Sequence, residues 1–159
     1  MDAREVSVRP TEPEDLDDVA RLYVALKEHH ARLRPDIPRY RVSDGRWRKV
    51  ADHALRDPDL VTLVAEIGGR VVGFTMLAFV EKPWGLSCEI DTMIVEAAQR
   101  SKGIGAEMLR AAEVEAYRRG AKGVRVDVLL ENYDGREFYQ RAGFEPFSVR
   151  YGKPVREPD

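Results

Sequence analysis

The sequence feature that most constrains the fold is a glycine loop between a strand-like and a helix-like stretch. Residues 99–105, QRSKGIG, follow the apolar stretch EIDTMIV and precede AEMLRAAEVEAYRRG, whose apolar residues recur at three- and four-residue spacing. The stretch GVRVDVLL then alternates apolar and polar residues. The order strand, glycine loop, helix, strand requires a crossover connection, so we expect the two flanking strands to be parallel.

A second feature is the pair Gly68-Gly69, which separates the apolar runs LVTLVAEI and RVVGFTMLAFVE and predicts a tight hairpin. Antiparallel strands beside a parallel crossover make the predicted sheet mixed. Apolar residues at helical spacing, from Leu16 to Leu33, predict one helix that should end before Pro35. A loop at 34–43 should follow, and then a shorter helix that contains Trp47 and Leu55. After the crossover, NYDGREFYQRAGF predicts a short helix, and EPFSVRYGKPV predicts one or two final strands.

The length and charge fit one folded domain without a strongly charged partner. At 159 residues, the chain is long enough for one core and too short for two ordinary domains. The 26 Lys and Arg nearly balance the 28 Asp and Glu, which argues against nucleic acid and membrane as partners. We expect one domain, 1–159, in four successive parts: 1–56 with the first strand and two helices, 60–95 with antiparallel strands, 99–120 with the glycine loop and its helix, and 123–156 with the last strands and helix.

The expected location is cytoplasmic, and no metal is expected. Cys88 is the only cysteine, which excludes an internal disulfide and fits a reducing compartment. No apolar run approaches the ~20 residues of a membrane span, and the start MDAREVSVRP has no hydrophobic signal core. The sequence contains neither an H-E-x-x-H motif nor paired cysteines.

The glycine loop has the chemistry of an anion site. The first amides of a helix lack intrahelical acceptors and carry partial positive charge, which suits a phosphate. Gly103 and Gly105 leave room for close approach, and Arg100 and Lys102 add positive charge. An ordinary helix start would look the same, so the loop alone leaves both interpretations open. Met108 stands where a dinucleotide fingerprint needs its third glycine, and the phosphate-loop motif of nucleotide triphosphatases does not occur.

Two motifs together resemble those of the GNAT-type N-acetyltransferases, which transfer the acetyl group of acetyl-CoA to an amine. Residues 100–105, RSKGIG, match the family's Q/R-x-x-G-x-G/A loop, and residues 132–144 match its N-x-x-A-x-x-F-Y-x-x-x-G-F segment. Gly135 departs from this pattern, in which Ala is more common. The order of elements agrees along nearly the whole chain, although residues 1–85 match in pattern rather than in motif. The resemblance implies a single-domain α/β fold: a mixed, largely antiparallel sheet with helices on both faces and a splay between the fourth and fifth strands.

The resemblance also implies which residues hold the cofactor. The loop amides would bind the pyrophosphate of CoA, and the main chain of the preceding strand would pair with the pantetheine arm as an added strand does. Asn132 would contact the cofactor arm or cap the last helix. The cofactor-binding residues expected on this basis are Met93, Ile94, Val95, Arg100, Ser101, Lys102, Gly103, Ile104, Gly105, Ala106, Asn132 and Tyr139.

Tyr139 matches the family's general acid, whose phenol donates a proton to the departing thiolate. The alternative is that Tyr139 only packs beside Phe138. A backbone N–H near Met93 or Ile94 is expected to stabilise the developing oxyanion.

Glu89 and Asp91 are the candidates for the general base. They lie two residues apart in a predicted strand and so project to one face, with Met93 and Val95 following on that face. In the family a strand glutamate often deprotonates the amine through water. Asp91 aligns better with that glutamate, and Glu89 lies one pleat further out. The alternative for both is a solvated edge charge or a partner of Lys or Arg, and together they would also attract a cationic substrate.

The remaining candidates rank lower. His29 and His30 border the loop next to the acceptor site, where packing or exposure is the commoner role, and His53 is isolated. Trp84 and Cys88 would line the acceptor cleft, or would be an edge tryptophan and a buried cysteine. Cys88 has no partner motif for a nucleophile, so we expect direct transfer without a covalent enzyme intermediate.

The expected function is therefore an N-acetyltransferase that acts on a primary amine of a small molecule. A protein N-terminus or a lysine side chain is the alternative acceptor, and a non-catalytic acyl-CoA-binding regulatory module is the alternative class. Residues 29–48, which should shape the acceptor pocket, carry no recognisable motif. A homodimer is common in the family and is expected on that ground alone.

Overall fold

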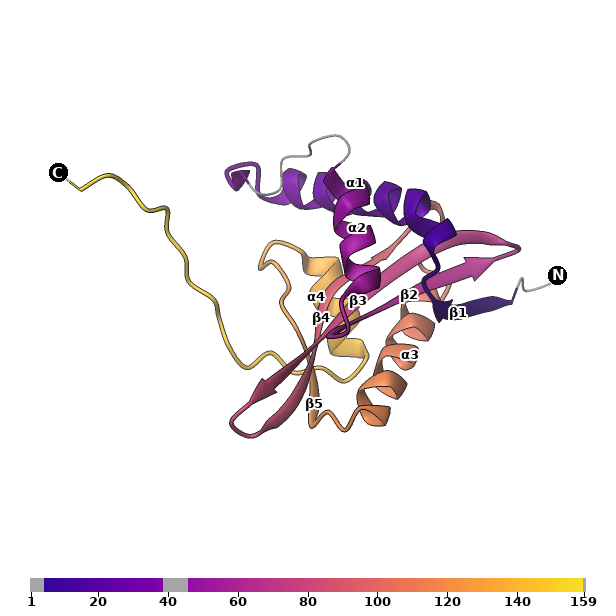
Figure 1. Ribbon diagram of the computed structural model, residues 1–159. Helices are drawn as coiled ribbons and strands as arrows, with labels where there is room; N and C mark the ends of the chain where they lie inside the picture. The colour runs from indigo at the N-terminus through magenta and orange to yellow at the C-terminus, as the bar shows by residue number, and fades with distance from the viewer. Residues whose placement is uncertain (1–4, 39–45, 159) are drawn as a thin grey trace. The chain divides into compact units, whose positions relative to one another are not determined.

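A five-stranded sheet in the order β1-β2-β3-β4-β5 organises the computed structural model, which describes residues 5–38 and 46–158 (Figure 1). The first four strands pair antiparallel with one another, and the fifth pairs parallel with the fourth. The strands are β1 (Val6–Pro10), β2 (Leu60–Ile67), β3 (Arg70–Lys82), β4 (Gly85–Val95) and β5 (Gly123–Val126). The predicted mixed, largely antiparallel sheet is confirmed.

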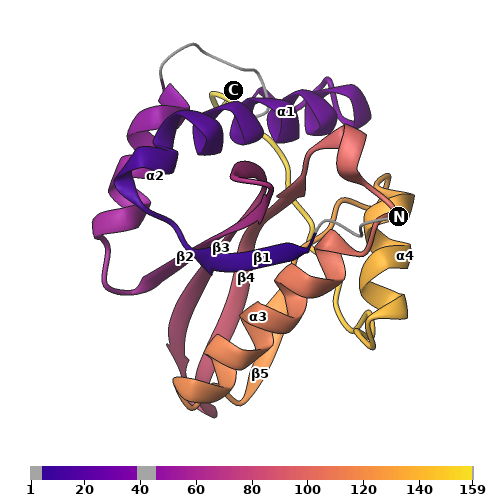
Figure 2. The same cartoon turned by 90° about the vertical axis from the view of Figure 1, so that its right-hand side faces the viewer.

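Helices cover both faces of this sheet (Figure 2). Helices α1 (Leu16–Leu33) and α2 (Arg46–Arg56) pack on one face, and α3 (Ile104–Arg118) packs on the other. The core between the sheet and the helices α1 and α2 contains the buried residues Leu16, Val19, Leu22, Tyr23, Ala51, Ala54, Val64, Val71, Phe74, Met76 and Ile94. The core between the sheet and α3 contains Ala65, Val72, Ile104 and Met108. The two helices expected from the amphipathic spacing are both present, and α1 ends before Pro35 as predicted.

Glycines shape the sheet at two places. Gly68 and Gly69 form the turn between β2 and β3 with φ of 57° and 78°, which confirms the predicted hairpin. Further along β3, a Cβ on Gly73 would lie 2.7 Å from Met108 Sδ and 3.2 Å from Ala65 Cβ. A larger residue at Gly73 would therefore require the side chain of Met108 on α3 to shift.

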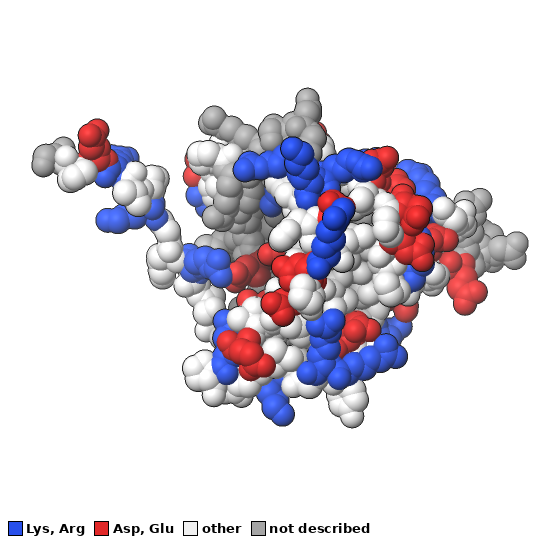
Figure 3. Space-filling model, viewed as in Figure 1, with Lys and Arg blue, Asp and Glu red and all other residues white. Residues whose placement is uncertain are grey.

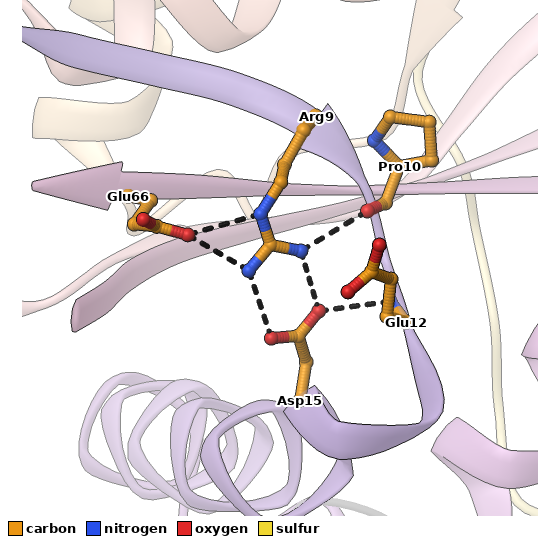
Figure 4. A network of polar contacts seen from close by, with 5 residues as sticks. All are labelled: Arg9, Pro10, Glu12, Asp15 and Glu66. Atoms are coloured by element: carbon orange, nitrogen blue, oxygen red, sulfur yellow. Dashed lines mark hydrogen bonds and ion pairs between the residues drawn. The ribbon is translucent and has the colours of Figure 1, made fainter. Parts of the chain in front are cut away.

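Hydrogen bonds from Arg9 link β1 to β2 and to the start of α1 (Figure 4). Its Nη1 and Nη2 donate to the carboxylate of Asp15 at 2.7 and 3.0 Å, and its Nε and Nη2 donate to Glu66 Oε2 at 2.9 and 2.8 Å. Asp15 also accepts a 2.8 Å hydrogen bond from the backbone N–H of Glu12, which caps the start of the short 3-10 helix η1 (Pro13–Asp15). The direction in which the chain leaves β1 is thereby set before α1 begins.

The ladder between β4 and β5 stops before β4 ends. It joins Ser87, Cys88, Glu89 and Ile90 of β4 to β5, whereas β4 continues to Val95. Beyond Ile90, the edge of β4 that faces away from β3 has no strand partner within the described part of the chain. This is the splay predicted between the fourth and fifth strands.

The chain divides into two compact units, Met1–Asp127, which contains the whole sheet, and Val128–Asp159. The second unit contains the predicted short helix as α4 (Tyr133–Arg141). The predicted final strands are not formed, since residues 145–158 lie in no helix or strand. An alternating segment becomes a strand only where a neighbour completes its main-chain hydrogen bonds, and none of the described strands pairs with these residues.

Candidate active site

The chain leaves β4 through a 3-10 helix, η3 (Ala97–Gln99), and a tight loop that leads into α3. Ser101 and Gly103 both adopt left-handed backbone conformations, with φ of 63° and 79°. Gly103 is the N-cap of α3 and supplies no side-chain cap. Apart from its two chain neighbours, a Cβ on Gly103 would meet no atom of the described residues within 4 Å, so the space above this residue is open.

The backbone amides from Ser101 to Ala106 have no acceptors among the described residues, whereas the N–H of Glu107 donates to Gly103 O at 3.1 Å. Several adjacent donors are thus concentrated at the N-terminus of α3, where the helix dipole is positive. Successive free N–H groups at the start of a helix form a cradle for an anion.

Two cations border these amides and are held by neutral acceptors. Arg100 Nε donates to Val95 O at 3.2 Å, and Lys102 Nζ donates to Gln99 Oε1 at 3.1 Å. Neither cation pairs with a carboxylate in the part of the chain that the structure describes, so both charges remain available to an anion. Free amides, open space and two cations fit the pyrophosphate of CoA.

The attraction of an anion to this loop would be local. Lys and Arg are interspersed with Asp and Glu over the face drawn in Figure 3, in keeping with a formal net charge of -2. A surface of mixed charge does not concentrate anions by itself, so the loop's own donors must supply the binding.

Asp91 lies in a bulge of β4. In the ladder between β3 and β4, Met76 is opposite Thr92 and Leu77 is opposite Ile90, which leaves Asp91 without a partner residue on β3. A bulge inserts one extra residue into one strand and changes the direction of the side chains beyond it. Asp91 is exposed at this point, while Ile90 and Thr92 are buried.

The bulge corrects one prediction about β4. We expected Met93 and Val95 on the same face as Glu89 and Asp91, but both pack against the core under α3, whereas Ile94 belongs to the core under α1 and α2. The strict alternation assumed in the prediction fails because Asp91 is the extra residue. The side chains of Met93 and Val95 therefore do not accompany the carboxylates.

Asp91 is associated with two polar residues on the side of α1. Thr92 Oγ1 donates to Asp91 Oδ2 at 3.1 Å, and Tyr23 Oη donates to Met76 Sδ at 3.7 Å. Burial raises the pKa of Tyr23 to about 12; a hydrogen bond with Thr92 opposes the rise and the negative charge of Asp91 adds to it. In the sequence, Tyr23 is only one of the residues at the helical spacing that predicts α1. A tyrosine among apolar residues at this spacing indicates a polar group nearby, because a buried hydroxyl needs a hydrogen-bond partner.

Glu89 also faces the side of the sheet covered by α1 and α2, as its neighbour Cys88 shows. Its neighbour Cys88 lies opposite Phe79, and the ring of Phe79 lies 4.6 Å from the Cζ of Arg119, the residue that caps α3. Cys88 therefore faces the α3 side, and Glu89 faces the side of α1 and α2. Lys82 Nζ lies 3.2 Å from Glu89 Oε1, so the expected alternative, a charge paired with a lysine, applies at least to Glu89.

Within the second unit, Asn132 caps α4. Its Oδ1 accepts the N–H of Gly135 at 3.1 Å, and a Cβ on Gly135 would lie 2.5 Å from Asn132 Nδ2. The glycine that departs from the family pattern thus leaves room for this cap. Tyr139 makes edge-to-face ring contacts with Phe138 and Phe144, at centroid distances of 5.0 and 5.4 Å. Burial raises the pKa of the Tyr139 phenol to about 12, so the phenol is protonated at neutral pH.

Three of the weaker candidates have ordinary surroundings. Burial raises the pKa of the Cys88 thiol to about 11, which makes it a poor nucleophile at neutral pH. Trp84 is half exposed, with the guanidinium of Arg125 over its ring at 4.6 Å. His53 Nε2 lies 3.8 Å from Asp57 Oδ2 on an exposed part of α2.

The predicted acceptor-side segment, residues 29–48, is only partly described. His29 and His30 lie near the end of α1 with ring centroids 6.1 Å apart, and residues 39–45 lie outside the described residues. Within the described ranges, no group of three or more His, Cys, Asp or Glu could hold a metal ion. None of the helices in these ranges combines the length and the apolar character that crossing a membrane requires.

Sequence comparisons match the chain to acetyltransferases. The model of the Acetyltransferase (GNAT) family matches residues 20–144. An uncharacterized N-acetyltransferase of Methanocaldococcus jannaschii is 30% identical over 153 residues, and the chain covers 63% of that protein's length with 92% of its own. An uncharacterized N-acetyltransferase of Archaeoglobus fulgidus is 31% identical over 144 residues, which cover 84% of this chain and 89% of that protein. The chain thus spans less than two thirds of the first relative and most of the second.

Solved structures share the fold at lower identity. A mutant of the BH1408 protein from Bacillus halodurans is 20% identical with a TM-score of 0.85, over 94% of this chain and 99% of that chain. The structure of AAC(6')-Iy in complex with the bisubstrate analogue CoA-S-monomethyl-acetylneamine is 16% identical with a TM-score of 0.75, over 96% of this chain and 99% of that chain. These likenesses concern the fold. Because the family model spans most of the sequence, the chain belongs to the acetyltransferase (GNAT) family.

Proposed function

We propose that this protein transfers the acetyl group of acetyl-CoA directly to a primary amine of a small molecule. The observation that carries the proposal is the set of free amides from Ser101 to Ala106, at a helix N-terminus directly after a strand with an open edge. A pyrophosphate-bearing cofactor with an extended arm matches both features, because the pyrophosphate accepts from the amides and the arm pairs with the open edge.

The cofactor residues would divide this work between side chains and main chain. Acetyl-CoA, when bound, supplies an activated thioester carbonyl. The amides of residues 101–106 hold the pyrophosphate, with Arg100 and Lys102 at its rim. The main chain of residues 93–95 holds the pantetheine arm, and an N–H near Met93 or Ile94 stabilises negative charge on the carbonyl oxygen. Asn132 contributes by capping α4.

The acceptor amine would approach from the layer of α1 and α2. Asp91 is exposed in its bulge and offers a carboxylate that attracts an ammonium group and accepts its proton, directly or through water. Glu89 faces the same layer and adds negative charge, although Lys82 offsets part of it. This arrangement supports Asp91 over Glu89 as the base.

Tyr139 would supply the proton that the departing thiolate needs. A phenol whose pKa is about 12 keeps its proton over the whole neutral range, so it is in the form that can donate a proton to the departing thiolate. Cys88, buried and protonated, has no part in the transfer, which supports a direct route without an acyl-enzyme.

Solved structures with a similar fold include enzymes for small-molecule acceptors and one for a protein acceptor. Two similar folds belong to aminoglycoside acetyltransferases from uncultured soil samples, and another belongs to a ribosomal-protein-alanine N-acetyltransferase of Brucella melitensis. The deciding experiment is a screen of purified protein with acetyl-CoA against aminoglycosides, polyamines, amino-acid derivatives and peptides, with release of free thiol as the signal.

Three outcomes of the screen are distinct. Thiol release with a small amine supports the proposal, and release only with peptides would move the acceptor to a protein N-terminus or lysine. Binding of CoA by calorimetry without thiol release from any acceptor would indicate a regulatory module. A chain that does not bind CoA would remove the cofactor site from the loop.

A further inference from the structure

Glu96 occupies the point where the chain leaves the sheet for the anion loop. Its N–H donates to Val72 O at 2.8 Å, which continues the pairing with β3 one residue past the end of β4. Its carbonyl accepts from Gln99 N at 2.9 Å and so begins the turn η3. The conformation of Glu96 therefore sets the direction in which the loop starts.

Two arginines from different elements donate hydrogen bonds to the side chain of Glu96. Arg21 Nη1, from α1, donates to Glu96 Oε1 at 2.8 Å, and Arg70 Nη2, from the start of β3, donates to the same oxygen. Arg21 also donates to Val71 O at 3.1 Å. The side chain of Glu96 is only 16% exposed, whereas those of Arg21 and Arg70 are 42% and 62% exposed, so the carboxylate is shielded from water although its two partners are not.

The second carboxylate oxygen of Glu96 is buried and has no hydrogen-bond partner among the described residues. A buried oxygen without a partner lowers stability, and most native structures avoid it. A carboxylate is also an unfavourable neighbour for a pyrophosphate, which Arg21 and Arg70 offset by neutralising it. Stability alone therefore does not account for a glutamate at this position.

We propose that Glu96 is a positioning residue for the acetyltransferase reaction: held by Arg21 and Arg70, it fixes the start of the 96–106 loop so that the amides converge on the CoA pyrophosphate. The inference rests on the proposed function of these amides. It adds that the geometry of the cofactor loop depends on α1, the helix on the acceptor side, because Arg21 belongs to that helix. Glu96 itself does not touch the cofactor.

The first test measures CoA binding by calorimetry for Glu96→Ala, Glu96→Gln and a matched control, Glu66→Gln. Glu66 is also a partly buried carboxylate held by an arginine at 2.8 Å, but its partner, Arg9, lies on β1 and not beside the loop. We expect Glu96→Ala to raise the Kd of CoA about tenfold, Glu96→Gln to restore part of the affinity, and Glu66→Gln to leave it within about twofold of the wild type.

The second test separates positioning from general damage by changing the acetyl donor. S-acetylpantetheine lacks the pyrophosphate, so a variant with a misplaced loop should lose about tenfold in kcat/KM with acetyl-CoA and almost nothing with S-acetylpantetheine. Equal losses with both donors, or an unchanged Kd of CoA in Glu96→Ala, would overturn the proposal.

Thermal unfolding accompanies both tests. If Glu96→Ala does not fold, the same comparison of CoA binding and donor use is made with Glu96→Gln and Arg70→Ala. Arg70→Ala removes one of the two arginine partners and keeps the carboxylate of Glu96. A wild-type protein that fails to bind CoA would contradict the proposed function and not the role of Glu96 alone, so the two failures are distinguishable.

Discussion

The guanidinium of Arg9 and the carboxylate of Asp15 are joined by two hydrogen bonds, of 2.7 and 3.0 Å, at the point where β1 leads towards α1. Asp15 is only 6% exposed. The hydrogen bonds from Arg9 hold the pKa of Asp15 below its ordinary value of 3.8; burial opposes this, and the N–H of Glu12 assists it. A carboxylate with a lower pKa in the folded than in the unfolded chain stabilises the fold above its unfolded pKa, and this contribution is lost as pH falls through the folded pKa.

The first prediction concerns this pair. Asp15→Asn should lower the free energy of unfolding at pH 7 by about 1–3 kcal/mol, because the guanidinium of Arg9 loses one of its two charged partners and keeps only Glu66. The variant should also lose less stability than the wild type between pH 5 and pH 3, since it lacks the titrating carboxylate. Urea unfolding over this range measures both effects. Asp17→Asn removes a carboxylate that is 87% exposed and should change neither; an equal effect there would refute the assignment.

The second prediction separates backbone strain from cofactor binding. Gly103 and Gly120 stand at the two ends of α3 with φ of 79° and 77°, and a Cβ on either would meet nothing within 4 Å. Gly103→Ala and Gly120→Ala should therefore each lower stability by about 1 kcal/mol, the cost of a left-handed alanine. Only Gly103→Ala should weaken CoA binding, by about tenfold, because its methyl group enters the space above the amides. Calorimetry with CoA compares the two, and similar affinities would remove Gly103 from the proposed site.

The third prediction ranks the two carboxylates. Asp91→Asn should lower kcat/KM for the amine about 100-fold or more, as expected on loss of a general base, and should leave the Kd of CoA unchanged. Glu89→Gln should cost less than about tenfold, because Lys82 already neutralises part of the charge of Glu89. Steady-state kinetics over a pH series decide between them. A larger effect at Glu89, or two unchanged pH profiles, would leave Asp91 as a solvated charge.

Local patterns predicted the helices and the hairpin, because each depends on residues that are close in sequence. The spacing of apolar residues located α1, and two glycines located the turn between β2 and β3. The splay between β4 and β5 was predicted from the resemblance of two motifs to those of the family, because the periodicity of apolar residues does not indicate it. The family membership is confirmed, whereas the acceptor, the homodimer, the cytoplasmic location and the single domain stay predictions.

Features that depend on pairing between distant residues could not be predicted. The bulge at Asp91 arises from the register between β3 and β4, and nothing within EIDTMIV marks the extra residue. The contact between Arg21 and Glu96 joins residues 75 positions apart, and either side chain alone resembles an ordinary surface charge. The segment after α4 alternates like a strand, but strand formation needs a partner that its own sequence does not specify.

The last prediction tests Tyr139 as the acid against Tyr139 as a packing residue. Tyr139→Phe keeps the ring that contacts Phe138 and Phe144 and removes only the hydroxyl, so the fold and the Kd of CoA should not change. If the phenol protonates the thiolate, kcat should fall about 100-fold. Because the pKa of Tyr139 is raised to about 12, the wild-type rate should show no loss from this group between pH 7 and pH 10. Tyr133→Phe, at a 72% exposed position of the same helix, is the matched control and should retain full activity. Full activity in Tyr139→Phe would show that the ring serves packing alone and that another group, or water, delivers the proton.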